Sequence, residues 1–489
     1  MNSNRVKRAI GLAGITLLIC TIYVLCNSTV SGAGFPLDDS WIHQTFARNL
    51  AETGRWEYMN GEPAAGSTSP LWTVLLAAGH LLKIDPTVWA FTLGIAGLIL
   101  TVIFCDALWS TFQPAQNKRI LPVFGLVIAT EWHLVWSALS GMETILYMVT
   151  VCLVFYLLLK QAPPWLLIGG LTGLLVWIRP DGLTLLGPVL FLALWNSNPW
   201  RQKWKAVGFA LVGTAISIAL YMAFNYSLDG SIWPNTLYAK QTEYAVLREQ
   251  SIVIRYFRLF GQINIGVGAI LAPGFLWQLF RIAKDRNRWG MAAFLWMAGF
   301  IGIYAVQLPV TYQHARYLIP VIPVYLLLGF SGFMDLISRM SDQNRIEFVV
   351  KKAWLISIIG VQAAFCLLGM RTYANDVAII NTEMVKAAQW VAENLPEDAK
   401  IATHDIGALG YFTRNQIVDL AGLINPEVIP IIRDEPELIQ YLQTNKIDYL
   451  VAFPGWYPLI VKETEMIYNT NSLFSPQTGG ENISVYLLK

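Results

Sequence analysis

Residues 9–40 have the sequence AIGLAGITLLICTIYVLCNSTVSGAGFPLDDS, in which an apolar run precedes the adjacent carboxylates Asp38 and Asp39. The run from Ala9 to Cys26 is close to the ~20 apolar residues that a membrane-spanning helix needs. Further apolar runs follow along the 489-residue chain, which is 55% hydrophobic and only 13% charged. This composition predicts a polytopic helical membrane protein and gives no indication of a nucleic-acid partner.

The positions of Lys and Arg predict how the chain crosses the membrane. Basic residues precede the first apolar run, which we interpret as a signal anchor with the N-terminus in the cytoplasm. The first outer loop then covers about residues 27–87, and every second connection after it is basic. These basic segments contain Arg5, Lys7 and Arg8, then Lys118 and Arg119, Lys160, Arg201, Lys203 and Lys205, Arg281, Lys284, Arg286 and Arg288, and Arg339, Arg345, Lys351 and Lys352.

This register predicts about 11 transmembrane helices and a C-terminus outside the cell. It requires that the short apolar stretch at residues 70–82 does not span the bilayer and instead forms a re-entrant or interfacial helix in the outer loop. Residues 41–50 place apolar side chains at helical spacing, which predicts an amphipathic helix lying in the headgroup plane. Its N-terminal end would stabilise an ionised carboxylate, which can serve as a base or metal ligand.

The composition changes to that of a soluble protein beyond Arg371, and we predict a domain boundary near Met370. Residues 1–370 would form the all-α membrane domain, and residues 371–489 an extracytoplasmic α/β domain. In the second domain we expect helices at residues 382–394, 406–412 and 435–445, and strands at residues 400–403, 416–420, 448–453 and 483–488.

Most of the conspicuous polar residues fall in the predicted outer segments. Besides the acidic pair, these segments contain Gly141-Met142-Glu143-Thr144, Arg179-Pro180-Asp181-Gly182, Pro234-Asn235-Thr236-Leu237-Tyr238-Ala239-Lys240 and His314-Ala315-Arg316-Tyr317. Short outer loops carry polar residues in any membrane protein, but gathering of so many blocks on one membrane face favours a functional site there.

These blocks resemble those of GT-C superfamily glycosyltransferases that use polyprenyl-phosphate sugars. The resemblance includes Asn60-Gly61-Glu62 and Gly66-Ser67-Thr68-Ser69-Pro70-Leu71-Trp72 in the first outer loop, and Asp405-Ile406-Gly407-Ala408-Leu409-Gly410-Tyr411-Phe412 near the C-terminus. It is greatest to the bacterial branch related to the mycobacterial terminal arabinofuranosyltransferases, and the order and spacing of the blocks carry it over nearly the whole chain.

The resemblance implies an integral-membrane glycosyltransferase of a bacterial plasma membrane. It would move a sugar from a polyprenyl-phosphate donor to a cell-envelope glycan on the outer face, with inversion if the transfer is a single displacement. Two alternatives stay open: a protein O-glycosyltransferase of the same superfamily, and a polyprenyl-lipid transporter or flippase.

The implied reaction needs a carboxylate, because the acceptor hydroxyl must lose a proton as it attacks the anomeric carbon. We predict Asp38 as the general base, with Asp39 as an orienting partner or as the base in its place. Glu143 is predicted to hydrogen-bond the acceptor or to bind a divalent metal ion together with Asp38. Helix capping is the simpler interpretation of all three carboxylates.

The reaction also needs positive charge where the phosphate departs. Arg179, Lys240 and Arg316 are outer cations near span ends, and Arg316 is the first choice because its planar fork can hold two phosphate oxygens. His314 is a weaker candidate for the same phosphate. Ordinary snorkelling to lipid headgroups is the alternative for the cations.

Overall fold

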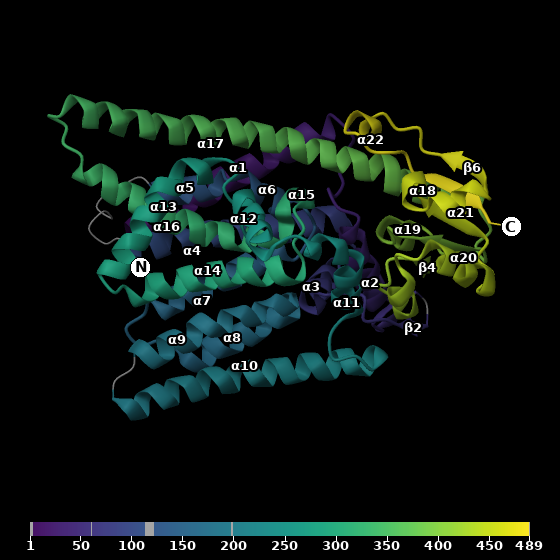
Figure 1. Ribbon diagram of the computed structural model, residues 1–489, viewed down its shortest axis with the longest axis horizontal. Helices are drawn as coiled ribbons and strands as arrows, with labels where there is room; N and C mark the ends of the chain where they lie inside the picture. Colours follow the sequence, from purple (N-terminus) through teal and green to yellow (C-terminus); the bar gives the residue numbers. More distant parts are fainter. Residues whose placement is uncertain (1–2, 60, 113–121, 197–198, 489) are drawn as a thin grey trace.

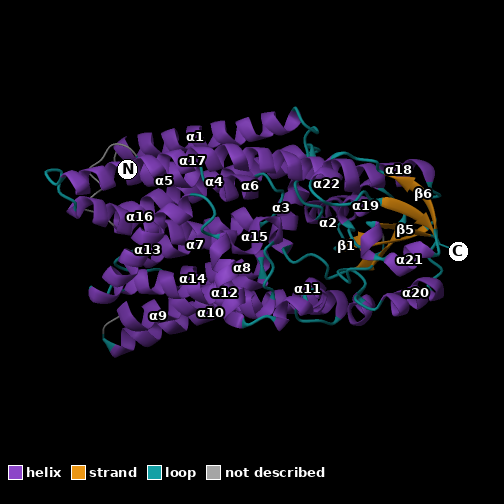
Figure 2. Cartoon of the chain, turned by 45° about the horizontal axis from the view of Figure 1, so that its top comes forward, coloured by secondary structure: helices purple, strands orange, loops and turns teal. Residues whose placement is uncertain are grey.

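The structure is a computed structural model that describes residues 3–59, 61–112, 122–196 and 199–488. A bundle of helices carries a small domain with a β-sheet at one of its ends (Figures 1 and 2). This architecture confirms the predicted fold class, a helical membrane part followed by an α/β domain. Asn60, Lys118 and Arg119, which the sequence patterns above include, lie outside the described residues.

Six helical segments of the described chain are long and apolar enough to cross a membrane. They are α1 (Ser3–Ser28), α4 (Pro86–Phe112), α10 (Trp200–Asp229), α14 (Arg288–Gln307), a segment made of α15 (Tyr312–Ala315), η4 (Arg316–Val321) and α16 (Ile322–Arg339), and the continuous helical segment Arg345–Asn394, which begins with α17 (Arg345–Ile380). The pair α12 (Ile252–Gln262) and α13 (Val267–Lys284), bent by 115°, makes a seventh if it counts as one span. The expected 11 membrane helices are therefore not confirmed as a number.

Shorter helices fill the rest of the bundle. They are α3 (Pro70–Leu81), α5 (Val123–Ala129), α6 (Trp132–Ala138), α7 (Thr144–Leu158), α8 (Trp165–Ile178), η2 (Pro180–Leu185), α9 (Leu186–Asn196), α11 (Asn235–Glu243) and η3 (Ala245–Glu249). With 12 residues, α3 is about 18 Å long, too short to cross a hydrocarbon core of about 30 Å.

Small residues let the helices of the bundle approach closely. A Cβ on Gly169 of α8 would lie 2.1 Å from the carbonyl oxygen of Ala210 in α10.

The basic turns lie together. The first residues of α10, the connection between α13 and α14, and the connection between α16 and α17 are at the end of the bundle opposite the C-terminal domain (Figure 1). The predicted outer segments gather at the other end, beside that domain. The bundle thus has one basic end and one end that carries the candidate site.

The helix α2 (Asp39–Thr53) differs from its expected place at the membrane surface. It packs against α3, against the hairpin of β1 (Glu57–Met59) and β2 (Glu62–Pro63), and against the C-terminal domain. Its polar face contacts protein as well: Arg48 Nη1 donates to the carbonyl oxygen of Tyr411 at 2.5 Å. Arg48 therefore holds the C-terminal domain against α2, whereas Gln44 and Asn49 bond to the carbonyl oxygens of Pro86, Glu57 and Tyr58 outside that domain.

The C-terminal domain continues directly from α17, which passes Met370 without a break and leads through the π-helical turn η5 (Asn381–Val385) into α18 (Lys386–Asn394). The sheet has the order β4-β3-β5-β7-β6. Strands β3 (Lys400–Thr403), β4 (Gln416–Asp419) and β5 (Tyr449–Ala452) are parallel, while β7 (Ser484–Leu487) and β6 (Glu465–Asn469) extend it antiparallel. Further helices are α19 (Gly407–Phe412), η6 (Pro426–Ile431), α20 (Glu435–Thr444), η7 (Pro454–Trp456), α21 (Pro458–Lys462) and α22 (Phe474–Gln477).

Candidate active site

Two cavities meet where the bundle contacts the C-terminal domain. The first, of about 540 Å³, lies among α2, η2, α11, α14 and η4, and we call it the bundle cavity. The second, of about 820 Å³, lies between the bundle and the C-terminal domain, and we call it the interdomain cavity. Residues that line both are Asp39, Ile42, Lys240, Arg316 and Leu423. The two cavities therefore share a wall with charged residues.

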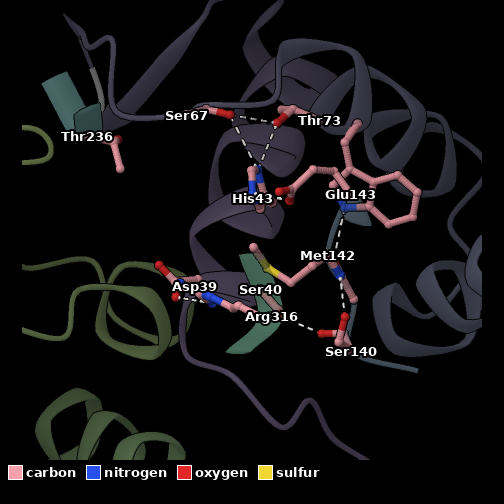
Figure 3. Close-up of polar contacts among 12 residues, drawn as sticks. Asp39, Ser40, His43, Ser67, Thr73, Ser140, Met142, Glu143, Thr236 and Arg316 are labelled. Atoms are coloured by element: carbon pink, nitrogen blue, oxygen red, sulfur yellow. Dashed lines mark hydrogen bonds and ion pairs between the residues drawn. The ribbon is translucent and has the colours of Figure 1, made fainter. Parts of the chain in front are cut away.

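Asp39 is the first residue of α2 and lies in that shared wall. Its Oδ2 is 2.7 Å from Arg316 Nη1 (Figure 3). Its Oδ1 is 3.8 Å from Lys240 Nζ. Burial alone would raise the pKa of Asp39, but the charges of Arg316 and Lys240 outweigh it and hold the pKa well below its usual range. Asp39 is therefore an ionised carboxylate between two cations.

The two cations are positioned by separate parts of the chain. Lys240 lies on α11, whose first turn is fixed to the outer loop because Thr236 Oγ1 donates to the carbonyl oxygen of Gly66 at 2.9 Å. Arg316 begins η4. Both cations donate to the hydroxyl oxygen of Tyr317, Lys240 at 2.8 Å and Arg316 at 3.2 Å. Two of the sequence blocks thus meet across the cavity and hold their cations side by side.

Arg179 forms a second, self-compensated group in the bundle cavity. Its Nη2 donates to Asp181 Oδ2 at 2.6 Å and lies 2.5 Å from the hydroxyl oxygen of Tyr304. The Tyr304 hydroxyl in turn donates to the same Asp181 oxygen at 2.5 Å. Because Asp181 neutralises it locally, Arg179 contributes a donor to the cavity but less net positive charge than the Arg316 and Lys240 pair.

Glu143 precedes α7 and faces the bundle cavity. Its loop is fixed because Trp72 Nε1 donates to the carbonyl oxygen of Gly141 at 2.9 Å, and Ser40 Oγ to that of Ser140 at 2.6 Å. This places Glu143 Oε2 at 3.5 Å from His43 Nε2 (Figure 3). The second outer block therefore reaches the cavity beside α2.

Asp38 points away from the cation pair and toward the C-terminal domain. Its carboxylate oxygens accept the backbone N–H groups of Gly407 at 2.6 Å and Ala408 at 2.8 Å, at the start of α19. The backbones approach so closely that a Cβ at residue 407 would lie 2.0 Å from the Asp38 carbonyl oxygen. Burial, together with the charge of Asp405, raises the pKa of Asp38 to about 8. Asp38 lines the interdomain cavity, where it also fastens α19 to α2.

The structure brings together Asp39, Glu143, Arg179, Lys240 and Arg316 around the bundle cavity. His314 lies elsewhere: its Nε2 is 2.7 Å from Asp376 Oδ2, on α17. The sequence reasoning missed His43, which also lines the bundle cavity. It follows Asp39 by four residues, a spacing that puts both side chains on one face of a helix, and this signal was available in the sequence.

The predicted metal pair does not fit the geometry. Asp38 uses both carboxylate oxygens to accept backbone N–H groups, whereas Glu143 faces the bundle cavity. Within residues 3–59, 61–112, 122–196 and 199–488, His, Cys, Asp and Glu side chains form no group of three or more that could hold a metal ion. We therefore derive no step through a metal.

Comparison with known sequences gives one match, in the C-terminal part. Residues 373–486 match a family described as "Domain of unknown function (DUF8728)". No curated protein matches the chain in sequence.

Solved structures match nearly the whole chain. ArnT from Cupriavidus metallidurans bound to undecaprenyl phosphate has a TM-score of 0.59 at 13% identity, covering 98% of this chain and 97% of its own. The oligosaccharyltransferase AglB from Archaeoglobus fulgidus, with an inhibitory peptide and a dolichol-phosphate, has a TM-score of 0.54 at 12% identity, covering 90% of this chain and 69% of its own. AftD, an arabinofuranosyltransferase from Mycobacteria, has a TM-score of 0.50 at 15% identity, covering 96% of this chain and 41% of its own. All three have the GT-C fold, and so does this chain.

Proposed function

We propose that this chain, a multi-pass membrane protein with the GT-C fold, is a glycosyltransferase that moves a sugar from a polyprenyl-phosphate donor to a cell-envelope glycan. The observation that carries the proposal is the position of Asp39, whose carboxylate lies between two cations in the wall shared by two cavities. A transferase must bring two substrates to one carboxylate, and this arrangement does so.

The bundle cavity suits the donor. Arg316 and Lys240 supply positive charge for the phosphate, and the Nε atom of Arg316 is buried without a hydrogen-bond partner among the described residues. Apolar side chains line the cavity on the side of η2, α11 and α14, including Leu183, Leu237 and Ile303. These would contact the first isoprenoid units, because an apolar wall beside a charged pocket matches a lipid phosphate. ArnT bound to undecaprenyl phosphate shares this fold.

The interdomain cavity suits a glycan acceptor. It opens between the two parts of the molecule and is lined by aromatic side chains, such as Tyr312 and Trp456, together with polar ones such as His404 and Arg433. Aromatic faces with a few well-placed polar groups are typical of sites for small polar ligands. An acceptor hydroxyl there would approach Asp39 from the side opposite the donor.

In the proposed reaction the acceptor oxygen attacks the anomeric carbon and gives its proton to the Asp39 carboxylate. The bond between the anomeric carbon and the phosphate oxygen breaks, and its electron pair leaves with the polyprenyl phosphate. Arg316 and Lys240 stabilise the negative charge that grows on this phosphate. Attack from the opposite side of the sugar inverts the anomeric configuration.

The low pKa of Asp39 makes it a weak base while both cations pair with it. The donor phosphate competes for the same cations, and their withdrawal raises the Asp39 pKa toward its ordinary value. Asp39 therefore becomes an effective base when the donor is bound. This order protects the site from activating an acceptor or water before a donor has arrived.

Asp38 competes for the role of base, because burial raises its pKa to about 8 and it lines the acceptor side. Its oxygens are already engaged by the N–H groups of Gly407 and Ala408. We therefore assign Asp38 to positioning the C-terminal domain against α2, and Asp39 to the proton transfer.

The test is release of polyprenyl phosphate from a panel of polyprenyl-phosphate sugars, with a membrane glycan extract as acceptor. We expect Asp39→Asn to lower turnover by about 10²–10⁴-fold while binding undecaprenyl phosphate at least as tightly as wild type, because Arg316 and Lys240 lose their competitor. Asp38→Asn should lower thermal stability and keep turnover in the fraction that stays folded. The reverse pattern assigns the base to Asp38.

Absence of turnover with every donor contradicts the proposed function, and equal turnover in Asp39→Asn contradicts the mechanism. If the sugar of the donor is labelled and the label passes to protein instead of glycan, the chain is the alternative protein O-glycosyltransferase. Transfer of intact donor across vesicle membranes, without release of phosphate, identifies the lipid transporter.

We propose the plasma membrane as location, with the N-terminus in the cytoplasm and the C-terminal domain outside. The basic turns at the end opposite that domain support this orientation by the positive-inside rule. Accessibility of a cysteine introduced at exposed Gln477, α22, to an impermeant reagent on intact cells tests it: labelling supports the orientation, and labelling only after lysis contradicts it.

A further inference from the structure

The bundle cavity contains a second polar cluster beside the cation pair. His43 on α2 and Glu143 at the start of α7 face the cavity, and the hydroxyl groups of Ser67 and Thr73 lie behind the imidazole (Figure 3). All four residues are at least nine-tenths buried. In the same view Asp39 and Arg316 form a separate group. The proposed proton transfer and phosphate binding leave this cluster without a role.

The hydroxyl groups orient the imidazole. Thr73 Oγ1 lies 3.3 Å and Ser67 Oγ 3.4 Å from His43 Nδ1, and the two hydroxyl oxygens are 3.1 Å apart. A hydroxyl that donates to Nδ1 leaves the ring proton on Nε2, which faces Glu143. The cluster thus presents an N–H donor and a carboxylate acceptor to the cavity.

The His43 N–H group and the Glu143 carboxylate do not form a good hydrogen bond with each other. His43 Nε2 and Glu143 Oε2 are 3.5 Å apart, beyond the 2.7–3.2 Å of a good N–H···O hydrogen bond. Glu143 Oε2 is buried and has no hydrogen-bond partner among the described residues. A buried carboxylate oxygen without a partner is costly, so the pair is built to receive a polar group from a ligand.

One hydroxyl group fits this gap. Its oxygen would accept the hydrogen bond from His43 Nε2, and its proton would be donated to Glu143 Oε2. A phosphate oxygen has no proton to donate and would be repelled by the carboxylate, so the phosphate belongs at Arg316 and Lys240.

We infer that His43 and Glu143 bind one hydroxyl group of the donor's sugar and make it a condition of transfer. This inference rests on the proposed function. The pair is held by the fixed loop of Glu143 and by the hydroxyl groups behind His43, so it cannot easily adapt to a sugar that lacks the group. A site built to hydrogen-bond a hydroxyl rejects the analogue without it strongly, because its buried polar atoms stay unpaired.

The experiment compares wild type, His43→Ala and Glu143→Gln on the donor that wild type turns over and on its monodeoxy analogues. We expect removal of one particular hydroxyl to lower wild-type kcat/KM by about 10²-fold or more. On the complete donor, each variant should lose a similar factor in kcat/KM relative to wild type. Removal of that one hydroxyl should then lower the kcat/KM of the variant by less than about fivefold, because the variant has already lost the interaction. His43→Gln, whose amide nitrogen replaces Nε2, should recover part of the loss.

Two controls separate this role from folding and from phosphate binding. Thr184→Val, elsewhere in the cavity lining, should change kcat/KM by the same factor for every analogue. Affinity of Glu143→Gln for undecaprenyl phosphate, which has no sugar, should stay within twofold of wild type.

The inference is overturned if the substitution and the removal of a hydroxyl lower kcat/KM by independent factors for every hydroxyl tested. It is also overturned if Glu143→Gln loses fivefold or more of its affinity for undecaprenyl phosphate. These results leave the proposed transferase standing. Absence of wild-type turnover with all donors overturns both together.

Discussion

Arg316 follows a strained segment, and its position depends on whatever holds that segment. Gln313, His314 and Ala315 have φ values of 50°, 57° and 50°, in the left-handed region. Each such residue costs ~1–2 kcal/mol when it is not glycine, so the three together store roughly 3–6 kcal/mol. Without compensating contacts the segment would relax, and the guanidinium of Arg316 would leave Asp39.

His314 provides the compensating contacts. Its Nε2 lies 2.7 Å from Asp376 Oδ2 on α17, and its ring makes edge-to-face contacts with Trp132 and Trp136 at centroid distances of 5.3 and 5.2 Å. A hydrogen bond to a charged group contributes ~1.5–3 kcal/mol, and each aromatic contact ~0.5–1.5 kcal/mol. The side chain of His314 therefore contributes roughly 2.5–6 kcal/mol, about as much as the strain.

We expect His314→Ala to weaken binding of undecaprenyl phosphate by up to about 70-fold, which corresponds to the lower limit of ~2.5 kcal/mol. Adding Ala315→Gly removes the strain of one Cβ, ~1 kcal/mol or more, and should recover about fivefold. Titration of undecaprenyl phosphate into the detergent-solubilised protein measures both effects. Ala315→Gly alone should be nearly neutral for this affinity, because the contacts of His314 already hold the segment in place.

An affinity of His314→Ala within twofold of wild type would refute this reasoning. So would a double variant that binds no better than His314→Ala, since the strain would then be irrelevant to the placement of Arg316.

Three further outcomes are expected. Gly407→Ala should destabilise the protein by ~2 kcal/mol, because its Cβ meets the Asp38 carbonyl oxygen, whereas Gly208→Ala, with open space around it, should change stability by less than ~1 kcal/mol; thermal unfolding measures both. Burial alone would lower the pKa of His404, but the hydrogen bond and the charge of Glu243 outweigh burial, so the pKa of His404 is raised. Burial alone would raise the pKa of Glu243, but His404 outweighs burial, so the pKa of Glu243 is lowered. The pair therefore stabilises the folded protein mainly between about pH 4.3 and 6.5, and its contribution disappears as pH rises through the raised His404 pKa. The Tm difference between wild type and Glu243→Gln should be largest near about pH 5.5 and shrink as the pH rises through the raised pKa of His404, and a constant difference would contradict it. Finally, EDTA should change release of polyprenyl phosphate by less than twofold, and a loss restored by a divalent ion would show that a metal takes part.

The sequence predicted helices and strands correctly where the spacing of apolar residues reflects their burial. The predicted strand at residues 400–403 coincides with β3, whose last three residues are buried. The strand β6 was missed, because it lies at the sheet edge with its first three residues exposed and lacks a buried apolar pattern. The short helix α3 was recognised by length alone.

The candidate site was harder to predict from the sequence, because its contacts join residues that are far apart in the chain. Neighbouring residues at the start of a helix point in different directions, but the sequence does not say which of Asp38 and Asp39 faces the cations. That depends on α19, about 370 residues further along the chain, whose N–H groups engage Asp38. The partner of His314 is likewise fixed only by the packing of α17. The spacing of His43 from Asp39, in contrast, was visible from the start.

The long helix α17 gives the molecule a mechanical property. Its 36 residues extend over about 54 Å, well beyond a hydrocarbon core of about 30 Å, and it carries Asp376 in the wall of the interdomain cavity before it leads into α18. The C-terminal domain thus continues from a stiff helix rather than from a flexible tether. A thicker or thinner bilayer changes the tilt of such a helix, so the width of the interdomain cavity, and with it the rate of the proposed transfer, should vary with the acyl-chain length of the surrounding membrane.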